Sequence, residues 1–314
     1  MTCTVSGIFI YPVKSCGGIE LKEAFITPTG FTFDRTWQVV DSRGFFLTQR
    51  TVPQLALVDT GLPIEALQPG WGRLSPEAAL VLNAPKMEAL HVALNPRARR
   101  SKVDVCVWEW DGEAEDEGED AARWFTQYLG MDCRLVQWCG KRPCDPAFAR
   151  EHQTAFSDGF PFLLISDPTL EGLNRETGEE YSMARFRPNI VVQGCAPNAE
   201  DTWQTFSIGS GIDDSQTEGT TAANSVVFEV VKPCSRCKIV TIDQSTAVAS
   251  TSAEPLVTIC KYRSGRALGF TQRDWRNQGF FGWNLVSLTD PSPISGIKCG
   301  DVLRVHKKRT EQQF

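Results

Sequence analysis

Short β-strand patterns, separated by glycine, proline, asparagine and aspartate, run through most of this 314-residue chain. Each pattern alternates apolar with polar residues or is rich in β-branched and aromatic residues, as strands are. The predicted strands cover residues 5–11, 18–27, 36–40, 45–48, 79–82, 90–94, 103–110, 162–165, 190–192 and 225–231. This spacing favours β-barrels over alternating β and α units. We therefore predict a mainly β fold with a few helices.

Two helices interrupt the strands. The clearer one covers residues 119–129, where Ala122, Phe125 and Leu129 repeat at helical spacing. Its acidic first turn suits the positive end of the helix dipole. A second helix is predicted over residues 168–175.

Two charge runs are interpreted as solvated loops. The acidic run at 113–120 leads into the first helix, and the basic run at 96–102 is the only dense cluster of positive charge. Within the basic run, Arg97, Arg99, Arg100 and Lys102 form a candidate docking site for an acidic protein partner.

The length of the chain favours two domains. The segment 139–146 contains glycine and two prolines, breaks the strand pattern and is predicted to start the linker. We place one domain at 1–140 and the other at 150–314.

Charge and cysteine usage narrow the class of protein. A net charge of −6 gives no electrostatic argument for a nucleic-acid or anionic-membrane partner. Eleven cysteines without regular spacing indicate free thiols in a reducing compartment, so we expect a cytoplasmic protein. No apolar stretch approaches the roughly 18 residues that span a bilayer, and we expect no signal peptide or membrane anchor.

The segment Cys234-Ser235-Arg236-Cys237 places two cysteines at a corner predicted to join two strands, 225–231 and 239–242. A thiolate at such a corner can reach into a cavity and bind a metal, and Arg236 beside it would favour the thiolate form. Three alternatives stay open: half of a structural zinc site, a redox pair of the thioredoxin kind, and two inert buried cysteines.

Three further clusters carry polar groups at strand ends. Lys14 and Ser15 follow the first strand after a proline-containing turn, and both can bind a phosphate or a pterin ring. The neighbours Asp34 and Arg35 precede another strand, although they could be a surface ion pair of little energetic value. The segment 185–192 sets two arginines and an asparagine ahead of an apolar strand, which suits a bidentate oxyanion.

These four clusters, in this order, resemble the MOSC superfamily, whose members carry a MOSC N-terminal β-barrel domain followed by a MOSC domain. The resemblance extends from about Val5 to Val305 and includes the segments 199–203, 281–284 and 300–303. It is strongest with the amidoxime reducing components, which are molybdenum enzymes. It implies two β-barrel-like domains, with the first 36 or so residues of the chain contributing to the cofactor site of the second.

The same resemblance implies a set of site residues around a molybdenum cofactor, the metal-carrying molybdopterin. Cys237 corresponds to the cysteine that ligates molybdenum, and soft thiolate ligation is consistent with a metal held by dithiolene sulfurs. Cys234 is expected to be structural or to lie behind the ligand. The residues expected to hold the pterin and its phosphate are Lys14, Ser15, Arg35, Arg187, Asn189, Ser235 and Arg236.

The chain departs from its relatives at the expected cofactor rim. After Asp158 it has Gly159 and Phe160 where relatives of the mitochondrial type carry a threonine and a serine, so only backbone contacts are carried over there. Asn284 stands where those relatives have a tyrosine. Both changes bear on substrate preference.

The implied activity is molybdenum-dependent reduction of N-hydroxylated compounds (amidoximes and N-hydroxylamines) by oxygen abstraction, with nitrite reduction to nitric oxide as a side activity. The chain has no dinucleotide-binding fingerprint in a strand-to-helix context, so its electrons should come from another protein. By resemblance, the donors are cytochrome b5 and NADH-cytochrome b5 reductase. The alternative is a molybdenum cofactor carrier or a sulfurase-type MOSC module without reductase activity.

Overall fold

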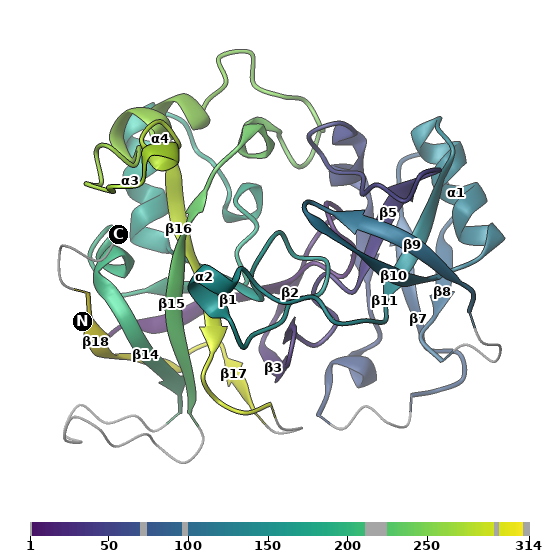
Figure 1. Ribbon diagram of the computed structural model, residues 1–314, viewed down its shortest axis with the longest axis horizontal. Helices are drawn as coiled ribbons and strands as arrows, with labels where there is room; N and C mark the ends of the chain where they lie inside the picture. Colours follow the sequence, from purple (N-terminus) through teal and green to yellow (C-terminus); the bar gives the residue numbers. More distant parts are fainter. Residues whose placement is uncertain (1, 70–73, 96–99, 211–224, 292–294, 310–314) are drawn as a thin grey trace.

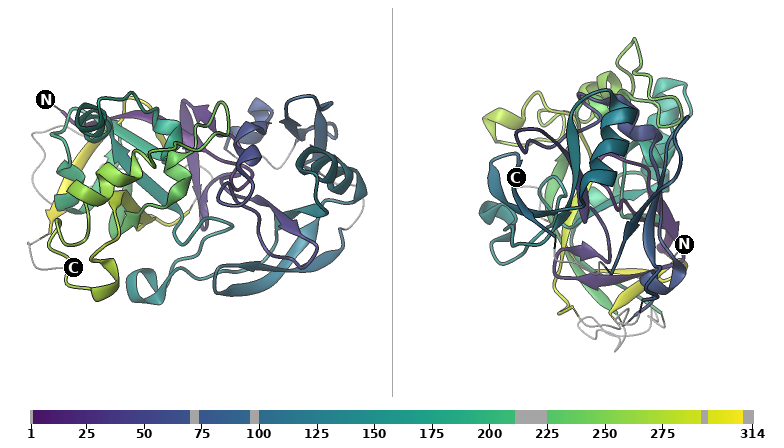
Figure 2. Two further views of the ribbon diagram at one scale, coloured as in Figure 1. Left: turned by 90° about the horizontal axis from the view of Figure 1, so that it is seen from above. Right: turned by 90° about the vertical axis from the view of Figure 1, so that its right-hand side faces the viewer.

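In a computed structural model the chain forms two β-rich units that lie side by side along the longest axis (Figures 1 and 2). The structure describes residues 2–69, 74–95, 100–210, 225–291 and 295–309. Within these ranges, no helix is long and apolar enough to cross a membrane. The prediction of a mainly β fold is confirmed.

The larger unit is a closed seven-stranded barrel. Its strands, in order around the barrel, are β1 (Thr4–Ile10), β13 (Ile190–Gln193), β12 (Phe162–Ser166), β16 (Phe280–Ser287), β15 (Val226–Ser235), β14 (Trp203–Gly209) and β18 (Val302–Lys308). Closure comes from β1, which pairs with both β13 and β18, so a strand from the start of the chain completes a barrel made from its second half. All neighbours are antiparallel except β12 and β13. Alternate side chains point inward and fill the barrel with apolar groups.

Short elements decorate the barrel. The strands are β2 (Ile19–Leu21), which pairs with β1, and a three-stranded sheet of β3 (Glu23–Thr27), β4 (Gly30–Phe31) and β17 (Gly296–Lys298). The helices are α2 (Pro146–Ala149), α3 (Asp167–Thr177), α4 (Leu256–Tyr262) and the 3₁₀ helices η3 (Met183–Arg185), η4 (Ala199–Thr202), η5 (Lys238–Thr241) and η6 (Arg273–Trp275). The helix predicted at 168–175 is confirmed as α3, which extends by a residue or two at each end.

The smaller unit packs two sheets, one α-helix and two 3₁₀ helices around a second core. Its strands are β5 (Trp37–Asp41), β11 (Cys133–Trp138), β10 (Trp110–Asp116) and β9 (Lys102–Val107) in one sheet, and β6 (Asp59–Gly61), β7 (Ala79–Asn83) and β8 (Leu90–Ala93) in the other. Its helices are α1 (Glu119–Leu129), η1 (Pro53–Leu57) and η2 (Ile64–Leu67). The predicted bounds of α1 are confirmed, and Gly130 ends the helix in the left-handed conformation that favours glycine.

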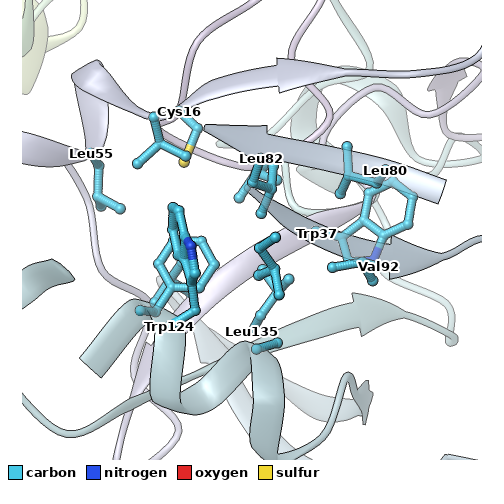
Figure 3. Packing of buried hydrophobic residues seen from close by; sticks show 14 of the residues in the cluster. Cys16, Trp37, Leu55, Leu80, Leu82, Val92, Trp124 and Leu135 are labelled. Atoms are coloured by element: carbon cyan, nitrogen blue, oxygen red, sulfur yellow. The ribbon is translucent and has the colours of Figure 1, made fainter. Parts of the chain in front are cut away.

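This second core fixes the position of the segment that contains Lys14 and Ser15, which precedes Cys16. Figure 3 shows Cys16 between Leu55 and Leu82, above Trp124. Burial raises the pKa of the Cys16 thiol to about 12, so it packs as a small apolar group. Because Cys16 is fixed in the core, the residues just before it are held at the edge of the smaller unit.

Several local predictions are wrong. Residues 45–48 form only isolated bridges, 103–110 is broken by a turn at Trp108 into β9 and β10, and 18–27 divides into β2 and β3. The acidic run at 113–120 is not a loop, because its first half belongs to β10 and its last two residues begin α1.

The charge runs are also less solvated than predicted. Glu117 is only 2% exposed at its side chain and pairs with Arg100 at 2.6 Å. The Trp37 indole also donates to Glu117, at 2.5 Å. Burial raises the pKa of Glu117 to about 7. Arg100 is therefore engaged, and Arg97 and Arg99 lie outside the described residues.

Candidate functional site

A cavity opens beside the end of β15, where the barrel meets the smaller unit. All twelve residues predicted for the cofactor site line it. They are Lys14, Ser15, Arg35, Asp158, Gly159, Phe160, Arg187, Asn189, Ser235, Arg236, Cys237 and Asn284. Residues outside that prediction also line it, among them Thr48, Arg50, Ser157, Arg185 and Cys234. The structure thus brings the predicted residues together, and their roles toward a ligand stay predictions.

The local fold explains how Cys237 reaches the cavity. Strand β15 ends at Ser235, and the Arg236 backbone N–H still donates to Gly279 O at 2.8 Å, so the chain leaves the barrel edge in a fixed direction. Cys237 follows in extended conformation and precedes η5. The strand predicted after the cysteines is wrong, because residues 238–241 form the 3₁₀ helix η5, and Ile242 makes an isolated bridge to Ala249 instead of joining a strand.

The Cys237 sulfur is contacted by Arg50, which the sequence analysis missed. Arg50 Nε donates a hydrogen bond to Cys237 Sγ at 3.2 Å. Arg236, expected beside the thiol, instead donates through Nε to Phe281 O at 2.7 Å and through Nη1 to Phe186 O at 2.9 Å. Cys234 also faces the cavity, and burial raises the pKa of its thiol.

Lys14 crosses to the segment that precedes β12. Its ammonium group donates to Phe156 O at 2.8 Å and to Asp158 Oδ1 at 2.5 Å. Burial lowers the pKa of Lys14 to about 8. Desolvation opposes ionisation of Asp158 as well, but the charges of Lys14 and Arg50 outweigh it and hold the pKa of Asp158 below its usual range.

Asp34 and Arg35 form a buried pair. Arg35 Nη1 donates to both carboxylate oxygens of Asp34, at 2.7 and 2.6 Å, and the Tyr11 N–H donates to Oδ1 at 2.8 Å. Asp34 is only 2% exposed, so the alternative of a surface pair is wrong. Burial raises the pKa of Asp34 despite the neighbouring guanidinium.

Two arginines lie over the Tyr11 ring. The guanidinium carbons of Arg35 and Arg187 lie 4.3 and 4.2 Å from the ring centre. Among the described residues, no carboxylate pairs with the Arg187 guanidinium, and burial lowers its pKa to about 10. Arg236 Nη2 is likewise buried without a hydrogen-bond partner in the described part of the chain. Buried cationic donors of this kind indicate a missing anionic ligand.

Three residues that line the cavity hold strained backbone. Ser15, Arg35 and Arg187 have φ angles of 70°, 47° and 57°, in the left-handed region that side chains other than glycine rarely adopt. Strain of this type costs on the order of 1–3 kcal/mol per residue and concentrates at ligand sites. Here all three side chains line the same cavity.

The cavity is electropositive, with one carboxylate among the described residues that line it, Asp158. The cationic residues are Lys14, Arg35, Arg50, Arg185, Arg187 and Arg236. Asn189 is less available than predicted, because its amide bridges Phe9 O at 3.1 Å and the Leu163 N–H at 3.2 Å. It holds β1 and β12 together and thereby supports the site.

A cysteine sulfur and a group of cationic side chains define what the site can hold. Among the described residues, no group of three or more histidine, cysteine or carboxylate side chains could hold a metal ion alone. All eleven cysteines are free. A metal bound through Cys237 must therefore bring most of its donors with it, as an anionic organic cofactor does.

Comparison with known proteins assigns both halves of the chain. Residues 2–132 match the family described as the MOSC N-terminal beta barrel domain, and residues 151–304 match the MOSC domain. The mitochondrial amidoxime-reducing component 1 of Mus musculus is 32% identical over 83% of this chain and 71% of its own length. Component 2 of Homo sapiens is 32% identical over 83% and 72%. A molybdenum cofactor sulfurase of Arabidopsis thaliana is 30% identical over 82% of this chain and 31% of its own length.

Proposed function

The chain belongs to the MOSC family that includes the mitochondrial amidoxime-reducing components, and from this premise we propose that it is a molybdenum-dependent reductase of N-hydroxylated compounds. Its family membership indicates that it binds the molybdenum cofactor. The substrate class, amidoximes and N-hydroxylamines, is the proposal, with nitrite reduction as a side activity.

One observation carries the proposal. Arg187 and Arg236 Nη2 face the cavity without an anionic partner among the described residues, and Cys237 lies in the same cavity. An anionic pterin with a terminal phosphate satisfies both guanidiniums, since arginine matches phosphate oxygens with parallel N–H donors. The residues present therefore fit the cofactor.

We assign the residues as follows. Cys237 provides the protein ligand to molybdenum, and Arg187, Arg236 and Ser15 hold the anionic groups of the pterin. Lys14 and Arg35 provide further positive charge, fixed by Asp158 and Asp34. The backbone at Gly159 and Phe160, together with Ser235 and Asn284, forms the rim.

When bound, the molybdenum supplies two-electron chemistry that removes an oxygen atom from a substrate. The chain provides what the cofactor lacks: a fixed thiolate, a ring of cations that binds negative charge, and a rim that selects substrates. By the resemblance, Phe160 and Asn284 stand where the mitochondrial relatives carry other residues, so we expect the substrate preference to differ as well.

Electrons for each turnover must enter from outside the chain. We propose a cytochrome b5 and its NADH-dependent reductase as the donors, acting in the cytoplasm. The predicted docking run is weakened by the engagement of Arg100 with Glu117, and Lys102 likewise pairs with Glu113 at 2.8 Å.

A second candidate function follows from the sulfurase relatives. The chain matches 31% of the Arabidopsis sulfurase, the share expected of one module of a longer protein. A carrier or sulfurase-type module would hold the cofactor without reducing N-hydroxylated substrates.

Three measurements on the purified protein test the proposal. Metal analysis should find molybdenum, and reduced methyl viologen should drive reduction of benzamidoxime to benzamidine. NADH should support the same reaction only after cytochrome b5 and its reductase are added. Bound molybdenum without reduction by viologen would favour the carrier, and NADH oxidation by the chain alone would contradict the need for a partner.

A further inference from the structure

We propose that Arg50 is a positioning residue that donates a hydrogen bond to the metal-binding sulfur of Cys237 and so tunes the reduction potential of the centre. The inference rests on the proposed function, because it concerns the loaded cofactor. It adds a residue that neither the motifs nor the family resemblance indicated.

The contact itself is specific. Arg50 Nε lies 3.2 Å from Cys237 Sγ, which is hydrogen-bond distance for a sulfur acceptor. Arg50 Nη2 lies 4.0 Å from Asp158 Oδ2, so the guanidinium spans the space between the ligand cysteine and the one carboxylate among the described lining residues. A planar guanidinium held at both ends has little freedom to turn away.

Trp108 holds Arg50 from the solvent side. The Arg50 guanidinium carbon lies 4.7 Å from the Trp108 ring centre, and Trp108 Nε1 donates to Asp158 Oδ1 at 3.3 Å. Trp108 has a φ of 56° and is 41% exposed, two costs that an ordinary turn residue avoids. The contact with Arg50 explains why Trp108 adopts a strained backbone and stays partly exposed: in this position its ring packs against the guanidinium.

An amide pair fixes the segment that carries Arg50. Gln49 Nε2 donates to Gln244 Oε1 at 2.9 Å, and Gln244 Nε2 donates back to Gln49 Oε1 at 3.0 Å. Gln49 Nε2 also donates to Ser15 O at 2.8 Å, and Gln49 is fully buried. Since Gln244 follows η5 closely, this pair ties the Arg50 segment to the segment that begins with Cys237.

The hydrogen bond from Arg50 should make the Cys237 sulfur a weaker electron donor toward a bound metal. A hydrogen bond to a thiolate withdraws electron density from the sulfur, and hydrogen bonds to ligand sulfurs are among the factors that set metal reduction potentials. Removing the donor should leave a more electron-rich sulfur and lower the potential. Residues that orient metal ligands typically change activity by about 10- to 100-fold when they are replaced.

The test compares Arg50→Met and Arg50→Lys with Arg43→Met as the matched control. Arg43 lies close along the chain, is 75% exposed at its side chain and pairs with Asp41 rather than with the cavity. For each loaded protein we would measure molybdenum content, the midpoint potential by redox titration, and the sulfur-to-molybdenum absorption band. Arg50→Met should retain molybdenum, shift the potential downward and shift the band, with Arg50→Lys in between and Arg43→Met like the wild type.

Trp108 provides a second test if Arg50→Met fails to fold. Trp108→Leu removes the aromatic face and should shift the potential in the same direction, whereas Trp108→Phe should shift it less. Unchanged potential and absorption in both Arg50→Lys and Trp108→Leu would overturn the inference. Loss of molybdenum from both Arg50 variants would also overturn it, by making Arg50 an anchor of the cofactor.

Different results would overturn the proposed function and the proposed role of Arg50. A wild-type protein that carries no molybdenum, or carries it without reducing benzamidoxime, would overturn the proposed function. A loaded and active wild type whose potential equals that of Arg50→Met overturns this inference alone.

Discussion

The two walls of the cavity use positive charge in different ways. On the wall from the first third of the chain, each cation already has a partner: Lys14 has Asp158, Arg35 has Asp34, and Arg50 has the Cys237 sulfur. On the barrel wall, Arg185 pairs with Asp243 at 3.1 Å. Among the residues that the structure describes, however, Arg187 there has no carboxylate partner, and Arg236 has one buried nitrogen without a partner.

This difference separates positioning from binding. A cation with a buried carboxylate partner, as Arg35 has in Asp34, contributes to the stability of the protein before any ligand binds, because its loss would leave a buried charge without a partner. A cation without one is costly in the empty protein and regains that cost when an anion binds. Replacements on the two walls should therefore affect different measurements.

The largest effect should come from the ligand on the barrel side. Cys237→Ala should abolish turnover, because the metal loses its protein ligand, while circular dichroism and the melting temperature stay close to those of the wild type. Cys234→Ala, which changes the second thiol in the same cavity, should retain activity in the viologen assay. An inactive Cys234 variant beside an active Cys237 variant would reverse the assignment.

Arg35→Ala should lower the stability of the cofactor-free protein by roughly 3–5 kcal/mol, because it leaves Asp34 buried and unpaired. Urea unfolding measures the loss. The double change Asp34→Asn with Arg35→Met removes both charges and should recover much of it. Equal losses for the single and double variants would mean that the pair is not the cause.

Arg187→Ala should do the reverse of Arg35→Ala. It should leave the unfolding free energy of the empty protein unchanged or raised, while cofactor affinity falls by about 1.5–3 kcal/mol, the value of a hydrogen bond to a charged group. Molybdenum content and rate per molybdenum distinguish binding from turnover. Full occupancy with a collapsed rate would place Arg187 in substrate chemistry.

The smallest effect concerns pH. Lys14 has a pKa of about 8 in the free protein, below the ordinary lysine value, because burial disfavours its charge. A bound anion favours the protonated form, so cofactor affinity should be highest below pH 8 and fall as pH rises above it, by at most about tenfold per pH unit. Lys14→Arg should be flat between pH 8 and 9.5, and a parallel decline in both proteins would exclude Lys14 as the cause.

Much of the architecture could be predicted because its signals are local. Helix α1 has an acidic start, a regular apolar face and a glycine immediately after its end, and its bounds match the prediction. Eight of the twelve predicted site residues lie in motifs at predicted strand ends, and the other four, Asp158, Gly159, Phe160 and Asn284, come from the family resemblance alone.

The features that could not be predicted from the sequence depend on contacts between residues that are far apart in the chain. Arg50 follows Leu47-Thr48-Gln49 in an irregular segment, and the sulfur that it contacts lies 187 residues downstream. Glu117 lies in a charge run typical of a solvated loop, yet Arg100 and Trp37 surround it in the fold. The 3₁₀ helix η5 has strand-like composition, but strand formation needs a neighbour that only the tertiary structure supplies.

The closure of the barrel by β1 also sets the order in which the protein can mature on the ribosome. The core of the smaller unit lies within residues 13–135, so it can form while the chain is still being made. Strand β1 can enter the barrel only later, because its neighbours β13 and β18 are both translated long after it. The cavity that Lys14 and Cys237 line is complete only after the barrel has closed, so we expect incomplete translation products not to bind the cofactor. During this interval β1 has only the short strand β2 available as a neighbour, and chaperone binding to its open edge should protect the nascent chain from aggregation.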